Sequence, residues 1–391
     1  MSEAIELIEQ LSSLSRQPDF TENDGAHMSA LHLAKKLEQA LQKPEDAALE
    51  LCFYPTFAAS ARVAINLKLF HLIAEAASPV TATELSKASG CSEPLLIRLL
   101  RPLSALQFMH EAGANTWTAS AITKAMCIPA IEAAHIHFWD QGTTAALHMP
   151  SFFTQTQYRQ PEDPRNGLFQ HAFGTEKEAF EHWATQPHVL DNFNTCMTGI
   201  RGSRPSWIEW WPVHARILDV QLGTEDVLLV DVGGGRGDDV QAFGRKFADA
   251  KGRLVLEDRA VVIADIQQLD ERVERVAHDF FTPQPITGAR VYFLHFILHD
   301  WSDAQCLAIL ARTTAAMQRG HSKLLLNEFV LPNQGCPLFP TGLDLQMMAM
   351  HAAQERTEMQ WRQLLDKAGL KVLEFYVPDG RGEGIIEAEL K

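Results

Sequence analysis

The spacing of apolar and polar positions predicts helices in the first part of the chain. Residues 1–50 show helical periodicity, interrupted by a polar stretch near Pro18 to Gly25, and "SALHLAKKLEQALQKPEDA" is amphipathic at helical spacing. From Tyr54 onward, "FAASARVAINLKLFHLIAEA" predicts a strongly apolar helix. The apolar faces of these helices are candidates for docking on a partner.

A winged helix is predicted next. The stretch "TATELSKASGCSEPLLIRLLRPLSALQFMHE" has a Thr/Ser cap, a short helix, a turn at Gly90 and a longer apolar helix, and "NTWTAS" after it predicts a β-wing. Such a module either binds DNA or serves dimerisation. We favour dimerisation, because only Arg98 and Arg101 place basic charge on the helix that would enter a DNA groove.

The middle of the chain, residues 128–222, is predicted to be helical, with a loop at "RQPEDPRNG". This region is rich in His, Phe, Trp and Met. Aromatic and Met side chains at helical spacing form either a core or the wall of a pocket. The three histidines His135, His137 and His148 add polar groups that a pocket could use.

After Gly223 the pattern changes to short apolar runs, most of them separated by segments of helix length. Alternation of this kind predicts a doubly wound α/β domain with a mainly parallel, Rossmann-like sheet. The five β-like runs are "DVLLVDVGGG", "GRLVLED", "ARVYFLHFIL", "SKLLLNEFVL" and "LKVLEFYV".

Composition narrows the functional classes. The chain has 391 residues, 46% apolar and 21% charged, which suits a soluble globular protein of two domains. The net charge of −15 argues against a nucleic-acid partner. No apolar run is long enough to span a bilayer, and the acidic N-terminus does not resemble a signal peptide. Six scattered cysteines without a C-x-x-C pair favour reduced thiols in the cytoplasm.

The strongest local signal is the glycine-rich loop in "LLVDVGGGRGDDV". A buried strand is expected to end at Asp231 and to turn through a glycine loop before a helix that starts near Asp239. Glycines let backbone N–H groups approach a ligand at the carboxyl end of the first strand. The loop glycines are Gly233, Gly234, Gly235 and Gly237.

Two classes of cofactor use such a loop. A dinucleotide would require a third glycine at the position of Asp238, and Asp238 and Asp239 oppose a phosphate at the helix start. S-adenosylmethionine (SAM) carries a sulfonium cation and no phosphate, so it fits better. Further acids follow later strands: Asp258 suits ribose hydroxyls, and Asp279 with Phe280 suits an adenine.

At this point the chain resembles the class I SAM-dependent O-methyltransferases that act on small molecules, as in plant phenolic and fungal secondary metabolism. The resemblance covers nearly the whole chain. Besides the predicted winged helix and "FEHWATQP", it rests on "VDVGGGRG", "LEDRAVVI", "HDFFTPQP", "ILHDWSD", "LLNEFVLP" and "HAAQERTEMQWRQLLDKAGL".

The resemblance implies a role for each matching residue. His299 would be the general base, oriented by Glu328 and Glu355, with Asp300 beside it. The cofactor-binding set would be Asp231, Gly233, Gly234, Gly235, Gly237, Asp258, Arg259, Asp279, Phe280 and His295. The acceptor pocket would include His137, Phe138, Met197, Met348 and His351.

The resemblance also implies a fold and an assembly. Residues 1–127 would form an N-terminal all-helical winged-helix dimerisation domain, and residues 128–391 the catalytic domain, with 128–222 as the helical wall of the pocket and 223–391 as the sheet. We expect a homodimer with a small-molecule substrate. The chemistry suits these residues, because a phenol with a pKa of about 10 needs a neutral imidazole to take its proton at neutral pH.

Three positions depart from the family pattern. His295 stands where Lys or Arg is usual, Arg259 stands where Leu is common, and His278 stands where Gly often precedes the adenine acid. A metal site formed by His295 and His299 is disfavoured, because the pair is expected to straddle a strand end instead of sharing one helix face.

An alternative keeps the fold and changes the chemistry. Some proteins that resemble fungal O-methyltransferases bind SAM but catalyse pericyclic reactions or dehydrations, and His137 aligns with a functional histidine of such a pericyclase. The intact set of His299, Glu328 and Glu355 favours methyl transfer, whereas His295 and His351 would suit hydrogen-bond catalysis on a carbonyl. A ligand-sensing DNA binder is disfavoured by the acidic balance.

Overall fold

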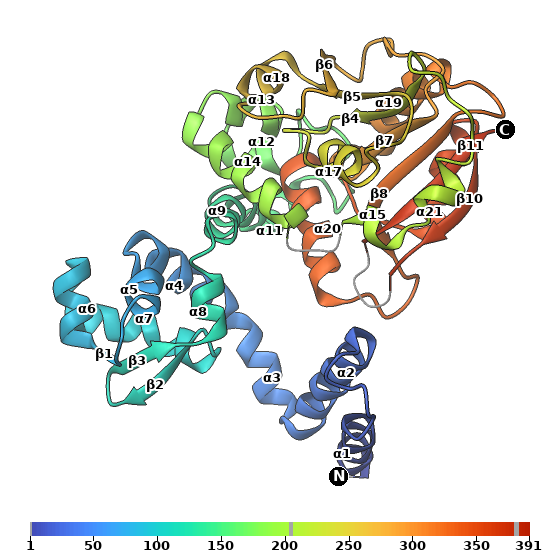
Figure 1. Cartoon of the computed structure of the whole chain (residues 1–391). Helices are drawn as coiled ribbons and strands as arrows, with labels where there is room; N and C mark the ends of the chain where they lie inside the picture. The colour runs from blue at the N-terminus through green and yellow to red at the C-terminus, as the bar shows by residue number, and fades with distance from the viewer. Residues whose placement is uncertain (1, 203–205, 379–382) are drawn as a thin grey trace. The chain divides into compact units, whose positions relative to one another are not determined.

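The computed structural model describes residues 2–202, 206–378 and 383–391. The chain divides into two compact units, Met1–Trp139 and Asp140–Lys391, which run from blue to teal and from green to red in Figure 1. A helical stretch continues from one unit into the next, through α9 (Pro129–His137) and the π-helical segment η2 (Phe138–Thr143). The domain boundary expected between residues 127 and 128 stays a prediction.

The first unit is mainly helical, and its local signals act as the sequence indicates. Thr81 and Glu84 form a capping box at the start of α6, and the helix ends at Gly90 with a φ of +73° that glycine adopts readily. Besides α9, its helices are α1 (Ser2–Ser15), α2 (Asp24–Leu41), α3 (Pro44–Glu50), α4 (Tyr54–Asn66), α5 (Leu69–Ala74), α6 (Ala82–Ser89), α7 (Glu93–Ala105) and α8 (Ala121–Ala125), with the 3-10 helix η1 (Leu51–Phe53).

A small sheet accompanies these helices where the wing is predicted. Its strands, in the order β1-β3-β2, are β1 (Val80–Thr81), β2 (Met109–Gly113) and β3 (Thr116–Ala119). β2 and β3 are antiparallel. The buried indole of Trp117 in β3 donates a hydrogen bond of 2.9 Å to Ser104 in α7, which fastens the wing to the helices.

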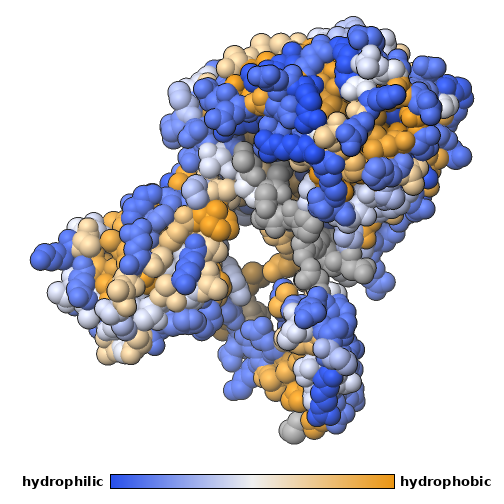
Figure 2. Space-filling model, in the orientation of Figure 1, coloured by the Kyte–Doolittle hydropathy of each residue, from blue (hydrophilic) through white to orange (hydrophobic). Residues whose placement is uncertain are grey.

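The hairpin of α1 and α2 leaves large apolar side chains in solvent. Ile5 and Ile8 of α1 are 53% and 51% exposed, and Leu31 of α2 is 50% exposed. Figure 2 shows orange, apolar surface over this hairpin. Burial of such side chains against another apolar surface would be favourable, so the hairpin is suited to an intermolecular contact.

The second unit contains a large sheet covered by helices. Its helices are α10 (Thr144–Ala146), α11 (Met149–Gln155), α12 (Leu168–Phe173), α13 (Ala179–Ala184), α14 (Pro187–Gly202), α15 (Trp207–Trp210), α16 (Val213–Arg216), α17 (Asp238–Lys246), α18 (Ala260–Asp265), α19 (Asp303–Ala316), α20 (Leu338–His351) and α21 (Glu358–Lys367). Val230 of β4 packs with side chains of α19 and α21 on one face, and Leu229 packs with Phe243 of α17 on the other. Helices on both faces make the sheet doubly wound, as predicted.

The strand order of this sheet is β10-β11-β8-β7-β4-β5-β6, with β9 paired to β8. Strands β4 to β9 pair in parallel, and β10 and β11 add an antiparallel edge. The strands are β4 (Val227–Val232), β5 (Arg253–Asp258), β6 (Val273–Ala277), β7 (Val291–His295), β8 (Lys323–Leu331), β9 (Arg356–Thr357), β10 (Leu370–Tyr376) and β11 (Glu383–Leu390).

Strands β6, β9 and β11 are absent from the five predicted runs. β6 is an edge strand whose sequence "VERVA" buries only Val273, so it lacks an apolar run. β11 contains the fully buried Glu387, which pairs with Arg216 and Lys323. A hydrophobicity pattern misses a strand that contains buried charges. The ion pairs that make this burial possible involve residues from distant parts of the chain.

Candidate active site

The glycine loop connects β4 to α17 at the carboxyl edge of the parallel strands. Gly233 has a φ of +72°, and a Cβ at this position would lie 2.6 Å from the side chain of Ile297. A Cβ on Gly234 would lie 2.5 Å from the carboxyl group of Asp231. Both distances are shorter than real carbon contacts, so the loop backbone packs against β4 and the turn after β7 only because these residues are glycine.

The predicted cofactor acids gather around this loop. Asp231 is fully buried in β4. Asp258, at the end of β5, accepts the backbone N–H of Gly235 at 2.8 Å. Asp279 follows β6 and accepts the backbone N–H of Phe281 at 3.0 Å, and the ring of Phe280 lies 3.5 Å from the Cβ position of Gly233. The side chains assigned to SAM therefore share one edge of the sheet, while their individual roles stay predictions.

His295 is the last residue of β7. Its Nδ1 is 2.7 Å from Oδ2 of Asp239 in α17, and its Nε2 is 3.4 Å from Oε1 of Glu383 in β11. The imidazole is buried. The imidazole thus lies between two carboxylates, and its contact with Asp239 joins the first turn of α17 to β7. Its predicted contact with the cofactor stays a prediction.

The turn after β7 carries the predicted base. Phe296 has a φ of +52°, in the left-handed region that costs a bulky residue energy, and the chain then forms the 3-10 turn η3 (Leu298–Asp300). The ring of Phe296 stacks on the imidazole of His299 with centroids 5.1 Å apart. This sharp change of direction brings His299 over the sheet edge instead of continuing the strand.

His299 is buried among acids. Its Nδ1–H donates to Oε1 of Glu355 at 2.8 Å, and its Nε2 lies 3.5 Å from Oδ1 of Asp300. Burial lowers the pKa of His299, but the charges of Asp300 and Glu355 and the hydrogen bond to Glu355 outweigh burial and raise the pKa to about 10.

Burial acts on the pKa values of the neighbouring carboxyl groups in the opposite sense. Burial raises the pKa of Asp300 to about 6 and the pKa of Glu328 to about 7, and in both cases the positive charge of His299 offsets part of the rise. The site therefore holds more acids than one imidazolium can neutralise. Additional positive charge in this pocket would be electrostatically favourable.

Glu328 contacts the backbone of the turn. Its Oε1 accepts the backbone N–H groups of Ile297 at 3.0 Å and Leu298 at 2.8 Å. The hydrogen bond to the imidazole comes from Glu355. Of the two carboxylates predicted to orient His299, Glu355 therefore touches the ring, and Glu328 fixes the backbone from which the ring projects.

Aromatic side chains from the helical segment lie beside the base. His351 at the end of α20 is buried, with its Nε2 3.9 Å from Oδ1 of Asp300. Its ring packs against Phe180 at 4.8 Å and Trp183 at 5.4 Å, both in α13. The guanidinium of the exposed Arg259 lies 5.8 Å from the ring of Phe180.

The other predicted pocket residues are more dispersed. Met197 in α14 packs against the cluster that contains Phe296, close to the base. Met348 is half-buried in α20. His137 and Phe138 belong to the first unit, where their rings meet edge-on at 5.7 Å and His137 is buried. The place of these four residues in an acceptor pocket stays a prediction.

Sequence reasoning missed three contacts in this region. The sequence indicates for Asp239 only a charge that opposes phosphate, whereas in the structure its Oδ2 lies 2.7 Å from Nδ1 of His295. Phe180 and Trp183 lie within "FEHWATQP", and the sequence alone does not indicate that their rings pack against His351. The signal that could have found them is the aromatic spacing Phe-x-x-Trp, which puts both rings on one face of a helix.

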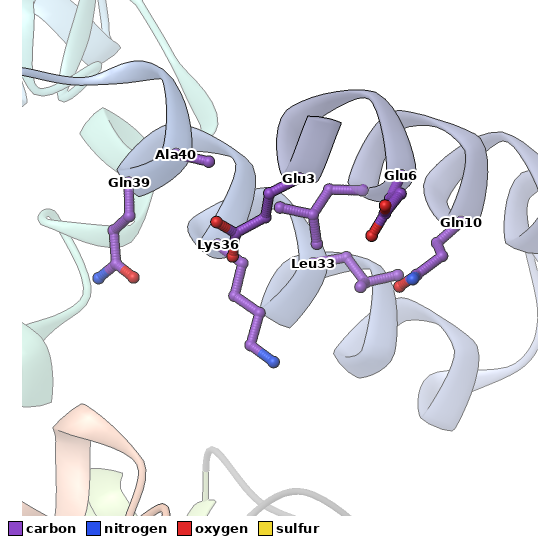
Figure 3. Close-up of a pocket in the computed structure, with 8 residues that line it drawn as sticks. Glu3, Glu6, Gln10, Leu33, Lys36, Gln39 and Ala40 are labelled. Atoms are coloured by element: carbon purple, nitrogen blue, oxygen red, sulfur yellow. The ribbon is translucent and has the colours of Figure 1, made fainter. Parts of the chain in front are cut away.

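Three further findings concern a hollow in the first unit, metal binding and membrane spans. A hollow between α1 and α2 contains none of the predicted site residues and is lined by Glu3, Glu6, Leu7, Gln10, Leu33, Lys36, Gln39 and Ala40 (Figure 3). Within residues 2–202, 206–378 and 383–391, no group of three or more His, Cys, Asp or Glu side chains is arranged so that it could hold a metal ion. None of the helices in these ranges is both long and apolar enough to cross a membrane.

The site fits SAM on structural grounds. The glycine loop forms a cradle that side chains would fill, the carboxylates of Asp231, Asp258 and Asp279 lie at the same edge of the sheet, and the carboxyl groups packed around His299 suit a sulfonium cation. The amino-acid end would be held by Asp231 and the loop, the ribose by Asp258, and the adenine by Asp279 and Phe280.

Comparison with known proteins identifies the family of the chain. The O-methyltransferase domain matches residues 158–371, and the O-methyltransferase dimerisation domain matches residues 49–127. The O-methyltransferase penC of Penicillium thymicola is 40% identical over 98% of this chain and 96% of its own length.

Solved structures match nearly the whole chain. LepI in complex with SAM aligns with a TM-score of 0.90 and 28% identity, over 99% of this chain and 100% of LepI. A structure described as a pericyclic reaction enzyme aligns with the same values. OxaC in complex with sinefungin and meleagrin aligns with a TM-score of 0.87 and 26% identity, over 99% of both chains. The chain therefore belongs to the O-methyltransferase family, whose cofactor is S-adenosylmethionine.

Proposed function

We propose that this protein is a SAM-dependent O-methyltransferase that acts on a hydroxyl group of an aromatic or polyketide-type secondary metabolite, with His299 as general base. The observation that carries the proposal is the buried hydrogen bond of 2.8 Å from His299 Nδ1 to Glu355. This bond places the proton of a neutral imidazole on Nδ1 and leaves Nε2 as the acceptor for a hydroxyl proton.

The cofactor site and the base site adjoin one another in the second unit. The side chain of Ile297, two residues before His299, touches the glycine loop at Gly233. Bound SAM would supply an electrophilic methyl group on a sulfonium cation. The residues of the chain would then hold the acceptor in line, exclude water and remove its proton.

The charges of the site support these roles of SAM and of the residues of the chain. With a pKa of about 10, His299 is protonated at neutral pH in the isolated protein. Positive charge in the neighbouring cofactor site disfavours the imidazolium and moves the pKa of His299 down, toward the range in which a general base works. Glu355 then stabilises the imidazolium that forms when His299 accepts the hydroxyl proton.

The proposed acceptor is flat and largely apolar. Phe180, Trp183 and His351 present ring faces and edges beside Asp300, and such surfaces favour aromatic ligands. Met197 adds a flexible apolar side chain near Phe296. In this proposal, Asp300 and His351 orient polar groups of the acceptor.

A second candidate function is a pericyclic or dehydration reaction without methyl transfer. The alignment with a pericyclic reaction enzyme at a TM-score of 0.90 favours it. The raised pKa of His299 also favours it, because an imidazolium can donate a hydrogen bond to a substrate carbonyl. In that reaction His299 would act as an acid or as a fixed hydrogen-bond donor.

One experiment separates the two candidates. The protein is incubated with SAM and candidate polyketide intermediates, and mass spectrometry follows the gain of one methyl group and the formation of S-adenosylhomocysteine. Methyl transfer produces both signals in equal amounts. An isomerised or dehydrated product with SAM unconsumed contradicts methyl transfer and supports the second candidate.

Two variants sharpen this experiment. His299→Ala is expected to abolish methylation without weakening the binding of SAM, because the base acts mainly in the transition state and because the variant lacks an imidazolium that would repel the sulfonium cation. His110→Ala is the control, since His110 is exposed on β2. Full methylation by His299→Ala would remove the base from the proposal.

We also propose a homodimer in the cytoplasm. The exposed apolar side chains of the α1–α2 hairpin and the matched dimerisation domain at residues 49–127 support self-association. All six cysteines are free, which supports a reducing compartment. Sedimentation at micromolar concentration is expected to give the mass of a dimer, and a monomer would contradict the assembly.

A further inference from the structure

The 3-10 turn that carries His299 is held by opposite charges on its two sides. Oε1 of Glu328 accepts the backbone N–H groups of Ile297 and Leu298. From the other side, the guanidinium of Arg356 donates to the backbone carbonyls of Leu298 and Trp301, each at 2.9 Å. We propose that Arg356 is a positioning residue, which fixes the turn so that the imidazole of His299 meets both Glu355 and the substrate.

Arg356 is bound on nearly every donor. Besides the two carbonyls of the turn, Asp303 Oδ1 accepts from Nε at 3.0 Å and from one terminal nitrogen at 2.9 Å. The guanidinium also lies 5.2 Å from the ring of Trp361. The side chain is 1% exposed, although Asp303 is 50% exposed. A buried guanidinium requires such partners, so the turn carbonyls and the cation hold each other in place.

Glu355 connects Arg356 to the proposed base. Glu355, which accepts the hydrogen bond from His299, directly precedes Arg356 at the start of β9. Arg356 pairs in register with Val330 of β8, two residues after Glu328 on that strand. Three charged groups therefore meet at the turn from two adjacent parallel strands. Glu328 comes from β8, and Glu355 and Arg356 come from the chain segment at the start of β9.

Lysine cannot replace this arrangement. Its ammonium group carries the same charge but lacks the planar fork that reaches two carbonyls and a carboxylate together. With Arg356→Lys we expect the turn to relax and His299 to leave its optimal position. Because a displacement of about 1 Å costs on the order of 100-fold in rate, we expect kcat to fall by about 10- to 100-fold. The affinity for SAM should change by less than about 3-fold.

The matched control is Arg290→Lys. Arg290 is also buried and also donates to backbone carbonyls, those of Ile217, Arg216 and His321, but it directly precedes β7, whereas the turn follows that strand. Both substitutions keep the positive charge and remove one buried, planar guanidinium group. Thermal unfolding is measured for both, and kcat is expressed per folded protein. A general loss of stability would lower kcat in both variants. The loss of a positioning role would lower kcat only in Arg356→Lys.

An NMR measurement, which requires no catalytic turnover, tests the same inference. The Nδ1–H proton of His299, assigned by its absence in His299→Ala, is followed by NMR in the full-length protein. We expect this resonance to shift or broaden in Arg356→Lys and to stay unchanged in Arg290→Lys. An unchanged resonance together with an unchanged kcat in Arg356→Lys would overturn the inference.

The inference rests on the proposed function only for its kinetic readout. If the wild type consumes no SAM, methyl transfer fails, but the NMR comparison and the rate of whatever product forms still test Arg356. If Arg356→Lys does not fold, Asp303→Ala carries the test, because it removes the acceptor of two guanidinium donors at a half-exposed position. We expect Asp303→Ala to lower kcat about 3- to 10-fold, and an unchanged kcat and resonance would again overturn the inference.

Discussion

His299 Nδ1 lies 2.8 Å from Glu355 Oε1, although the two residues are 56 positions apart in the chain. Both groups are buried, so the bond forms in a setting where an unpaired charge would be costly. Glu355 is positioned by its own backbone N–H, which donates to Asp344 of α20 at 2.8 Å. The orientation of the proposed base therefore depends on the chain segment that follows α20.

Replacement of Glu355 tests this relationship. We expect Glu355→Gln to lower kcat by at least about 100-fold, because the amide cannot stabilise an imidazolium and can favour the wrong tautomer. Steady-state kinetics and calorimetric SAM affinity are measured together, and the affinity should change little. Glu358→Gln is the control, since Glu358 is exposed and pairs with Arg362 at the surface. Equal kcat in the two variants would exclude an orienting role for Glu355.

The pKa of His299 predicts a pH dependence of stability. The folded pKa of about 10 exceeds the ordinary value of 6.5, so protonated His299 stabilises the fold below about pH 6.5, and this contribution is lost as the pH rises through about 10. We expect the difference in melting temperature between wild type and His299→Ala, both without cofactor, to decrease from pH 7 to pH 10. A constant difference would mean that His299 is neutral in the folded protein.

The buried carboxyl group of Glu257 predicts a second loss of stability as the pH rises. Burial raises the pKa of Glu257 to about 7, and its Oε2 accepts from Gln284 at 2.8 Å. The folded protein binds this proton more tightly than the unfolded chain does, so the group costs stability as the pH rises from about 4.5 to 7. The full cost is on the order of 3 kcal/mol.

Glu257→Gln should therefore gain stability relative to wild type as the pH increases from 5 to 8. Denaturant unfolding at these two pH values measures the change in the free energy of unfolding. Glu274→Gln is the control, because Glu274 is an exposed residue of β6. A parallel pH dependence of wild type and Glu257→Gln would show that Glu257 is ionised in the fold.

The close approach at the glycine loop predicts a loss of cofactor binding. A Cβ at Gly234 would lie 2.5 Å from the carboxyl group of Asp231 and from Leu256, so Gly234→Ala must displace the loop. We expect SAM affinity to fall by at least about 10-fold, as measured by calorimetry. Gly342→Ala in α20 is the control, because a Cβ there meets no atom within 4 Å. Wild-type affinity in Gly234→Ala would place the cofactor elsewhere.

Substitutions of His295 test the position at which Lys or Arg is expected from the family resemblance. Its imidazole lies between Asp239 and Glu383 and joins α17 to the sheet. We expect His295→Ala to weaken SAM binding by about 10-fold, because the start of α17 loses this anchor, and His295→Lys to retain more affinity by restoring a positive charge. If His295→Ala binds SAM as the wild type does, the bridge has no part in shaping the cofactor site.

The sequence determined those features of the protein that depend on local chemistry. The positive φ of Gly233, the cap at Thr81 and the central apolar strands follow from residues close together in the chain, so their patterns could be interpreted directly. The family motifs also named His299, Glu328 and Glu355. Sequence spacing could not say which carboxylate touches the imidazole.

Only the tertiary structure decided how the distant residues meet. It placed Glu355 on the ring and Glu328 on the turn backbone, it surrounded His295 with two carboxylates, and it brought Arg356 beneath the turn. It also buried Glu387 in a strand that hydrophobicity did not predict. The physical reason is that buried polar groups must be paired, and the partners come from segments that only the packing of the sheet brings together.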